Sequence, residues 1–191
     1  KMSPELLEPI VVTATRNEQS AFDLPVSIDS VNQAQLQDGQ LQVNLSESLA
    51  RIPGINVQNR QNYAQDLQIS SRGFGARSSF GVRGLRLYAD GIPATMPDGQ
   101  GQVSHFDLGS AARIEVMRGP FSSLYGNSSG GVISLFTEDG APGATITPSA
   151  TFGSYGTQRI GTKLSGDTGT LNYVADISSF RTDGYRDHSA A

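Results

Sequence analysis

The last third of the chain alternates apolar and polar residues with a period of two. Between Thr145 and Phe152 the even positions are apolar and the odd positions are polar. The same alternation recurs in residues 159–165 and 171–178, and short glycine-containing turns separate the three segments. A period of two is that of a β-strand with one apolar face. The pattern predicts three consecutive antiparallel strands, belonging either to half of a soluble β-sandwich or to a membrane β-barrel.

The first 140 residues mix short helical and strand signals. One helix is predicted over residues 30–39, where Ser30 and Gln33 form a capping-box pattern. A second is predicted over residues 45–52, whose leucines and isoleucine fall on one helical face before a Pro-Gly stop. Short strands are predicted at residues 26–28, 55–57, 67–70, 85–88, 113–117 and 132–136. These elements indicate an α+β domain with a small mixed sheet and short helices.

Composition supports β structure and excludes several functions. Hydrophobic residues make up 37% of the chain, Gly numbers 22, and Trp and Cys are absent, which favours β structure with many loops. The net charge is −4 and the arginines are scattered, so binding of nucleic acid through charge is not expected. No stretch approaches 18 consecutive apolar residues, and the N-terminus lacks the apolar region of a secretory signal. A membrane-spanning helix is therefore not expected.

Residues 115–126 and 130–133 resemble the signature of the TonB-dependent receptor plug domains, in which a Glu-Val-x-Arg-Gly-Pro-x-Ser-x-Leu-Tyr-Gly core is followed by Gly-Gly-Val-Ile. Four further segments resemble other parts of such receptors in the expected order: residues 10–15 the TonB box, 45–55 the early plug helix and strand, 71–75 an Arg-Gly-Phe turn, and 87–93 the central hairpin. Two of the glycines also have a direct physical reading. Gly130 and Gly131 allow the chain to pass closely against neighbouring strands.

The resemblance implies a fold class and three segments. The fold class is an α+β plug domain followed by the first antiparallel strands of a truncated transmembrane β-barrel, so the resemblance favours the barrel over the sandwich. Residues 1–20 would be a periplasmic tail, 21–139 the plug domain, and 140–191 the start of the barrel. Only 52 residues follow Asp139, enough for about three or four strands, whereas membrane barrels have at least eight. The sequence is therefore expected to be a fragment that aggregates or is disordered in isolation.

The resemblance also implies three groups of functional residues. The TonB-binding group would be Ile10, Val11, Val12, Thr13, Ala14 and Thr15. Charge contacts between plug and barrel would involve Arg72, Arg113, Glu115 and Arg118, although a solvated strand edge would explain the same charges. Plug loops facing a ligand would present Tyr63, Arg77, Phe80, Met96, Gln100, Gln102 and His105.

The implied function is active import without catalysis. The TonB box would pair as an added strand with the C-terminal domain of TonB, which is energised by an inner-membrane complex. The ligand would be a scarce small molecule such as a ferric siderophore. Residues 89–102 resemble the receptor branch that includes the pyrroloquinoline quinone receptor, so this cofactor is the alternative cargo. The expected location is the outer membrane of a Gram-negative bacterium, with the plug and N-terminus facing the periplasm, as a monomer in contact with lipid.

Two other classes of function are the alternatives to transport. A soluble β-rich binding module remains the alternative of another class. Gly126 to Gly130 fits a nucleophile elbow around Ser128, but such an elbow needs a helix after the serine, and a strand is predicted there. The two histidines, His105 and His188, have no cluster of further ligands near them in the sequence. No catalytic residue, metal site or cofactor is expected.

Overall fold

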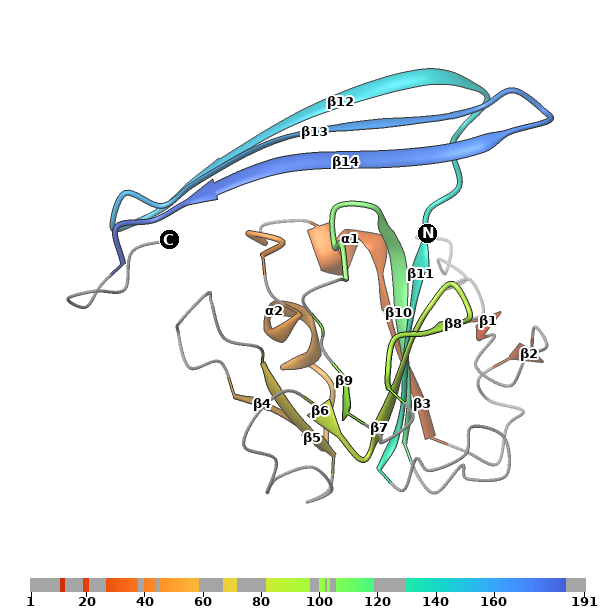
Figure 1. Ribbon diagram of the computed structural model, residues 1–191, viewed down its shortest axis with the longest axis vertical. Helices are drawn as coiled ribbons and strands as arrows, with labels where there is room; N and C mark the ends of the chain where they lie inside the picture. The colour runs from red at the N-terminus through yellow and green to blue at the C-terminus, as the bar shows by residue number, and fades with distance from the viewer. Residues whose placement is uncertain are drawn as a thin grey trace, which may run out of the picture.

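The computed structural model describes residues 11–12, 19–20, 27–37, 40–43, 45–58, 67–71, 82–96, 100–101, 103, 106–118 and 130–184. Within these ranges the chain forms four sheets and two short helices (Figure 1). Residues 27–137 contribute two sheets and both helices, and we call this part the α+β unit. Residues 143–181 form a three-stranded sheet, which we call the meander.

A five-stranded mixed sheet is the centre of the α+β unit. Its strands, in order across the sheet, are β3 (Ser27–Asn32), β10 (Ala111–Arg118), β11 (Gly131–Thr137), β7 (Leu85–Ala89) and β8 (Ile92–Pro93). β11 and β7 run parallel, and the other neighbours are antiparallel. The sheet is buried on both faces, since Ile114 joins the main core while Met117 packs in a second cluster with Val132.

A smaller four-stranded sheet lies on the other side of the core. Its strands, in order, are β4 (Ile55–Gln58), β5 (Gln68–Ser71), β6 (Val82–Arg83) and β9 (Gln100–Gly101). Near the N-terminus, β1 (Val11–Val12) pairs antiparallel with β2 (Gln19–Ser20). Every strand predicted from the sequence is present, in several cases extended by one or more residues.

The first helix begins later than the sequence predicts. α1 (Gln33–Gln37) follows β3 directly, and its capping box is formed by Asn32 and Gln35. The amide of Gln35 donates to Oδ1 of Asn32 at 2.9 Å, and the amide of Asn32 donates to Oε1 of Gln35 at 3.1 Å. The prediction that Ser30 caps the helix is wrong because Ser30 lies within β3, opposite Glu115 of β10. Pairing in the sheet therefore extends the strand up to Asn32.

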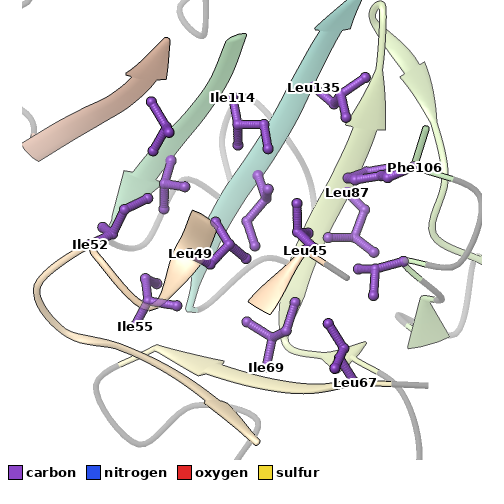
Figure 2. Close-up of a cluster of buried hydrophobic side chains, with 14 of the residues drawn as sticks. Leu45, Leu49, Ile52, Ile55, Leu67, Ile69, Leu87, Phe106, Ile114 and Leu135 are labelled. Carbon is purple, nitrogen blue, oxygen red and sulfur yellow. The ribbon is translucent and has the colours of Figure 1, made fainter. Parts of the chain in front are cut away.

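The second helix supplies the centre of the core. α2 (Ser46–Leu49) lies between the two sheets, and Figure 2 shows Leu45, Leu49 and Ile52 among aliphatic side chains from both. These three side chains are exposed by only 3%, 0% and 4%, which confirms their predicted common face. Burying a leucine or isoleucine side chain contributes about 1.5–3 kcal/mol. The helix is only four residues long, so tertiary burial rather than helix propensity holds it.

The meander consists of three antiparallel strands of ten residues each, β12 (Gly143–Phe152), β13 (Gln158–Asp167) and β14 (Asn172–Arg181). Its two faces differ as the alternation predicts. The outer face exposes aliphatic and aromatic side chains, with Ile146 68% and Ile177 80% exposed. The inner face is polar and lies over the end of the α+β unit where α1 is found (Figure 1).

Candidate functional site: the contact between the α+β unit and the meander

The predicted TonB-binding segment is described only at its centre. Val11 and Val12 form β1, and their partners in β2 are Ser20 and Gln19, respectively. The other four residues of the predicted TonB-binding segment lie outside the described residues: Ile10, Thr13, Ala14 and Thr15. One edge of Val11–Val12 is thus paired with the same chain, and the role of this segment in binding a partner stays a prediction.

Two of the predicted contact charges, Arg113 and Glu115, are joined on one face of β10. Nε of Arg113 donates to Oε1 of Glu115 at 2.9 Å, and the Glu115 side chain is fully buried. The Arg113 guanidinium also lies 4.2 Å from the ring centroid of Phe136 on β11. A buried carboxylate is costly unless it is paired, so the pair with Arg113 stabilises Glu115 inside the unit.

The third predicted charge, Arg118, ties three segments together at the end of β10. Its guanidinium lies 2.5 Å from Oδ2 of Asp29 on β3, and Nη1 donates to the carbonyl of Pro53 at 2.5 Å. Arg72 lies outside the described residues. The described partners of Arg113, Glu115 and Arg118 belong to the α+β unit. Contact between these charges and a barrel wall stays a prediction.

The structure describes two of the residues that are predicted to face a ligand, Met96 and Gln100. Met96 is 63% exposed, and its backbone amide donates to the carbonyl of Gln100 at 2.8 Å. A bridge between Thr95 and Gly101 lies beside this hydrogen bond, so the described ends of the segment between β8 and β9 are paired with each other. The other candidates lie outside the described residues: Tyr63, Arg77, Phe80, Gln102 and His105.

The structure shows a contact between the α+β unit and the meander that the sequence analysis missed. Lys163 on β13 points from the inner face towards Glu138, just after β11, and its Nζ lies 2.7 Å from Oε1. The other oxygen of Glu138 accepts a hydrogen bond from the side-chain amide of Gln33 on α1. Side-chain exposure is only 15% for Lys163 and 13% for Glu138. Glu138 thus links the first helix to the second strand of the meander.

A second contact lies beside the first. Asp176 is the cross-strand neighbour of Lys163, and its carboxylate lies 3.6 Å from Nη2 of Arg159. It also packs against Gly109, where an added Cβ would lie 2.8 Å from the carboxylate carbon and would require the Asp176 side chain to shift. The carbonyl of Gly109 accepts a hydrogen bond of 3.1 Å from the side-chain amide of Gln37 on α1. The loop before β10 is thereby held between α1 and β14.

The segment between β11 and β12 is fixed to the meander. The amide of Gly140 donates to Oδ1 of Asn172 at 2.9 Å, and the amide of Asp167 donates to the carbonyl of Ala141 at 3.0 Å. We call Glu138 to Pro142 the linker.

Charged residues at the inner positions of the meander strands could have indicated, from the sequence, a contact with the α+β unit. Their partners could not be read from the sequence because Gln33 and Glu138 are 105 residues apart.

The model of the TonB-dependent receptor plug domain matches residues 20–132, more than half of the chain. The chain belongs to this family. The matched range runs from before β3 to the second residue of β11 and so contains most of the α+β unit, which we now call the plug.

Known relatives agree with this assignment. The hemin receptor of Yersinia enterocolitica is 33% identical over 139 residues, which cover 71% of this chain and 19% of that protein. The ferric yersiniabactin uptake receptor of Yersinia pestis superposes with a TM-score of 0.62 at 26% identity, covering 82% of this chain and 24% of its own. The alcaligin outer membrane receptor of Bordetella pertussis gives a TM-score of 0.69 at 22% identity and covers 91% of this chain and 29% of its own.

The structural matches extend beyond the plug into the meander, because they cover up to 91% of the chain. The fold is therefore an α+β plug followed by antiparallel barrel strands, as the sequence predicts. The chain spans about a fifth of the length of the hemin receptor, whose match covers 19% of that protein. The relatives are named as receptors rather than as enzymes.

Metal-binding groups and membrane-spanning helices are two further features to consider in the described residues. Among them no group of three or more His, Cys, Asp or Glu side chains is placed to hold a metal ion. No helix in the described part of the chain has the length and apolar character needed to cross a membrane.

Proposed function

We propose that this chain is the plug, with the first barrel strands, of a TonB-dependent outer-membrane transporter that imports an iron chelate. The observation that carries the proposal is the two-faced meander. Its outer face exposes Ile146, Ile160 and Ile177, whereas its inner face carries Lys163 and Asp176 against the plug. A strand of about 9–11 residues with one apolar face suits a wall between lipid and a wet lumen.

The boundaries of the proposed segments are those predicted from the sequence. Residues 1–20 form a tail with the TonB box, residues 21–139 the plug, and residues 140–191 the first barrel strands. Three strands cannot close a barrel, so the rest of the wall would come from a longer receptor of the length of the relatives. The plug and the N-terminus face the periplasm, and the outer face of the meander contacts outer-membrane lipid.

The names of the relatives support an iron-containing cargo. One relative is a hemin receptor, one structural neighbour is a ferric yersiniabactin uptake receptor, and another is a pyoverdine outer membrane receptor. We therefore propose a ferric siderophore or haem as the cargo of this chain. Pyrroloquinoline quinone, suggested by the resemblance of residues 89–102, is tested beside them.

Growth rescue by the full-length receptor tests the cargo. A Gram-negative host without its own uptake systems would carry the receptor and receive hemin, a panel of ferric siderophores, or pyrroloquinoline quinone under the matching limitation. Rescue by an iron chelate, dependent on TonB, is the expected result. Rescue by pyrroloquinoline quinone alone would replace the iron assignment while leaving the transporter class in place.

The role of the N-terminal strand is tested with two substitutions at one position. Val12→Pro removes a backbone donor that an added strand needs, so uptake should be lost while ligand binding is kept. Val12→Ala keeps the backbone donor and should transport normally. Equal uptake by both variants would show that residues 10–15 are not the TonB box.

A further inference from the structure

Among the described residues, the outer face of the meander carries one charged side chain. Cross-strand pairing defines this face as rows of residues, which run from Ala144, Gly166 and Tyr173 at one end to Phe152, Gln158 and Arg181 at the other. Its positions are the even residues of β12 and β13 and the odd residues of β14. Arg181 is the only charged residue at these positions. A charge on a face that contacts lipid is costly, so its position needs a physical reason.

Arg181 lies where an arginine costs least on such a face. Ile177 belongs to the middle row of the outer face, and Arg181 ends β14 further along the same strand. At about 3.3 Å per residue the two residues lie about 13 Å apart along the strand. The apolar band of a membrane barrel is about 25 Å tall. With Ile177 near the middle of the membrane, Arg181 therefore lies at the edge of the band, next to the lipid headgroups.

The exposed side chain of Arg181 has no ion pair or hydrogen bond within the part of the chain that the structure describes. The arginine on the inner face, Arg159, is by contrast buried and lies 3.6 Å from Asp176. The acid nearest to Arg181 in the sequence is Asp183, and its carboxylate lies against Gly156 instead. The guanidinium of Arg181 is therefore available to an anionic group from outside the described chain.

The turn between β12 and β13 is hydrogen-bonded to the residues that follow Arg181. Tyr155 in this turn has φ of +58°, a conformation that residues other than glycine rarely adopt. Its carbonyl accepts hydrogen bonds from the amide of Asp183 at 2.9 Å and from the hydroxyl of Thr182 at 3.4 Å. The hydroxyls of Thr157 and Thr182 lie 2.8 Å apart. These bonds hold the strained backbone of Tyr155 beside the end of β14.

Two exposed aromatic side chains accompany Arg181. Phe152 is 72% exposed and belongs to the same row, and Tyr155 is 64% exposed. Phe152 and Arg181 are separated by one strand, so their backbones lie about 10 Å apart. Aromatic rings favour the boundary between lipid and water, where one side of the ring is apolar and the other is wet. This end of the outer face thus combines a cation with two aromatic rings.

The end with Arg181 is the one away from the start of β12. Figure 1 shows β1 and the first residues of β12 on one side of the molecule and the turn between β12 and β13 on the other. β1 is the described part of the predicted TonB box, so under the proposed function its side is periplasmic. Arg181 then faces the outer leaflet. In Gram-negative bacteria this leaflet consists of glycolipids whose glucosamine headgroups are phosphorylated.

We propose that Arg181, flanked by Phe152 and Tyr155, binds a headgroup phosphate of the outer-leaflet glycolipid. A guanidinium can donate two parallel hydrogen bonds to a phosphate, which gives the contact a defined geometry as well as charge attraction. The inference rests on the proposed function, because it assumes that the outer face contacts the outer membrane. It adds a lipid-binding site to the wall, which sets the height of the first strands in the membrane.

The stabilising effect of purified lipid A tests the site. The full-length receptor is folded into micelles of a neutral detergent, and its unfolding temperature is measured as lipid A is added. Lipid A should raise this temperature for the unmodified receptor. For Arg181→Gln, the lipid A concentration that gives half of the rise should be roughly tenfold higher, because a hydrogen bond between charged groups is lost. Arg181→Lys keeps the charge without the paired hydrogen bonds and should lie between the two.

Matched controls separate this site from general effects of charge. Arg83→Gln removes an exposed arginine from β6 in the plug and should respond to lipid A as the unmodified receptor does. Inorganic phosphate at the same concentrations should stabilise neither protein, because it lacks the acyl chains that place the headgroup at Arg181. Without lipid A, Arg181→Gln and the unmodified receptor should unfold at the same temperature.

The outcomes distinguish the site from the proposed function. The same half-rise concentration of lipid A for Arg181→Gln and the unmodified receptor would overturn the lipid site. An equal rise with inorganic phosphate would also overturn it, in favour of a site for free anions. TonB-dependent uptake is measured on the same unmodified receptor. Its absence would overturn the proposed function, whereas normal uptake with no effect of Arg181→Gln on the lipid A response would overturn the lipid site alone.

A second experiment addresses the aromatic residues. Tyr155→Asn removes the ring while keeping a residue that tolerates positive φ, so the turn should be retained. The half-rise concentration of lipid A should increase for this variant. Tyr173→Asn removes a tyrosine from the opposite end of the outer face and should leave that concentration unchanged. Equal increases for both variants would show that Tyr155 has no specific part in the site.

Discussion

Lys163 and Asp176 lie opposite each other on β13 and β14, and each contacts a different segment of the chain outside the meander. Lys163 is salt-bridged to Glu138 at 2.7 Å, while Asp176 packs against Gly109. One cross-strand pair on the inner face thus contacts both the linker and the loop before β10. The inner face of the meander therefore makes defined polar contacts with the rest of the chain.

Breaking the ion pair of Lys163 and Glu138 should weaken the plug. Lys163→Met leaves a largely buried carboxylate with fewer partners, and we expect a loss of about 1.5–3 kcal/mol in the free energy of plug unfolding. Calorimetry of the purified full-length receptor measures this. Arg181→Met, at an exposed position on β14, is the control. In a double-mutant cycle with Glu138→Gln, a coupling energy near zero would contradict the observed contact.

The core around α2 should be sensitive to loss of volume. Leu49→Ala removes a side chain that is fully buried between the two sheets, and the expected cost is about 2–5 kcal/mol. Ile92→Ala removes a comparable side chain that is 69% exposed and should change stability by less than about 0.5 kcal/mol. Denaturant unfolding of the plug compares the two. Similar midpoints would show that α2 is not part of the core.

Arginine should not be replaceable by lysine at position 118. The guanidinium reaches Asp29 and the carbonyl of Pro53 at once, which a single ammonium cannot do with the same geometry. Arg118→Lys should lower plug stability, and Arg83→Lys, at an exposed site on β6, should not. The measurement is the unfolding temperature of the plug in the full-length receptor. An unchanged temperature for Arg118→Lys would mean that one of the two contacts is dispensable.

At two adjacent positions of β14, a new lysine should impair folding on the outer face and be tolerated on the inner face. Ile177→Lys places an ammonium on the outer face, where a lysine near the membrane midplane costs about 2–4 kcal/mol. Ser178→Lys places it on the inner face and should be tolerated. Folding of the full-length receptor into phospholipid vesicles, followed by heat-modifiable migration in gels, separates the two. Equal folding yields would contradict the assignment of the faces.

Glycine should be required at position 131. Its backbone has φ of +131°, and a Cβ there would collide with the carbonyl oxygen of Met117 on β10. Gly143 also has a positive φ, of +90°, but a Cβ there meets no atom within 4 Å. Gly131→Ala should therefore destabilise the plug by more than the roughly 1–2 kcal/mol expected for backbone strain alone at Gly143→Ala. Urea titration of both variants gives the comparison.

Much of the secondary structure could be predicted because it depends on neighbours in the sequence. The alternation of residues 145–178 predicts the meander and its two faces, and the spacing of Leu45, Leu49 and Ile52 predicts the buried face of α2. The start of α1 was predicted wrongly. Ser30 and Asn32 both precede a glutamine by three residues, and the pairing of Ser30 with Glu115 decided between them.

The candidate site was less predictable than the fold. The sequence pointed to Arg113, Glu115 and Arg118 as contact charges, and the described partners of all three lie inside the plug. The contact with the meander is made instead by Glu138, Lys163 and Asp176. Contact of Arg113, Glu115 and Arg118 with the wall of a complete barrel stays a prediction.

The sequence by itself determined the strands, the apolar and polar faces of the meander and the family, because periodicity and short motifs are local properties of the chain. Only the tertiary structure decided that Gln33, Glu138 and Lys163 meet, and that Gly109 lies under Asp176. These contacts join residues far apart in the chain, and they depend on the order of strands across the sheets. Side-chain pairing of this kind follows from the packed arrangement of the elements, which no local pattern contains.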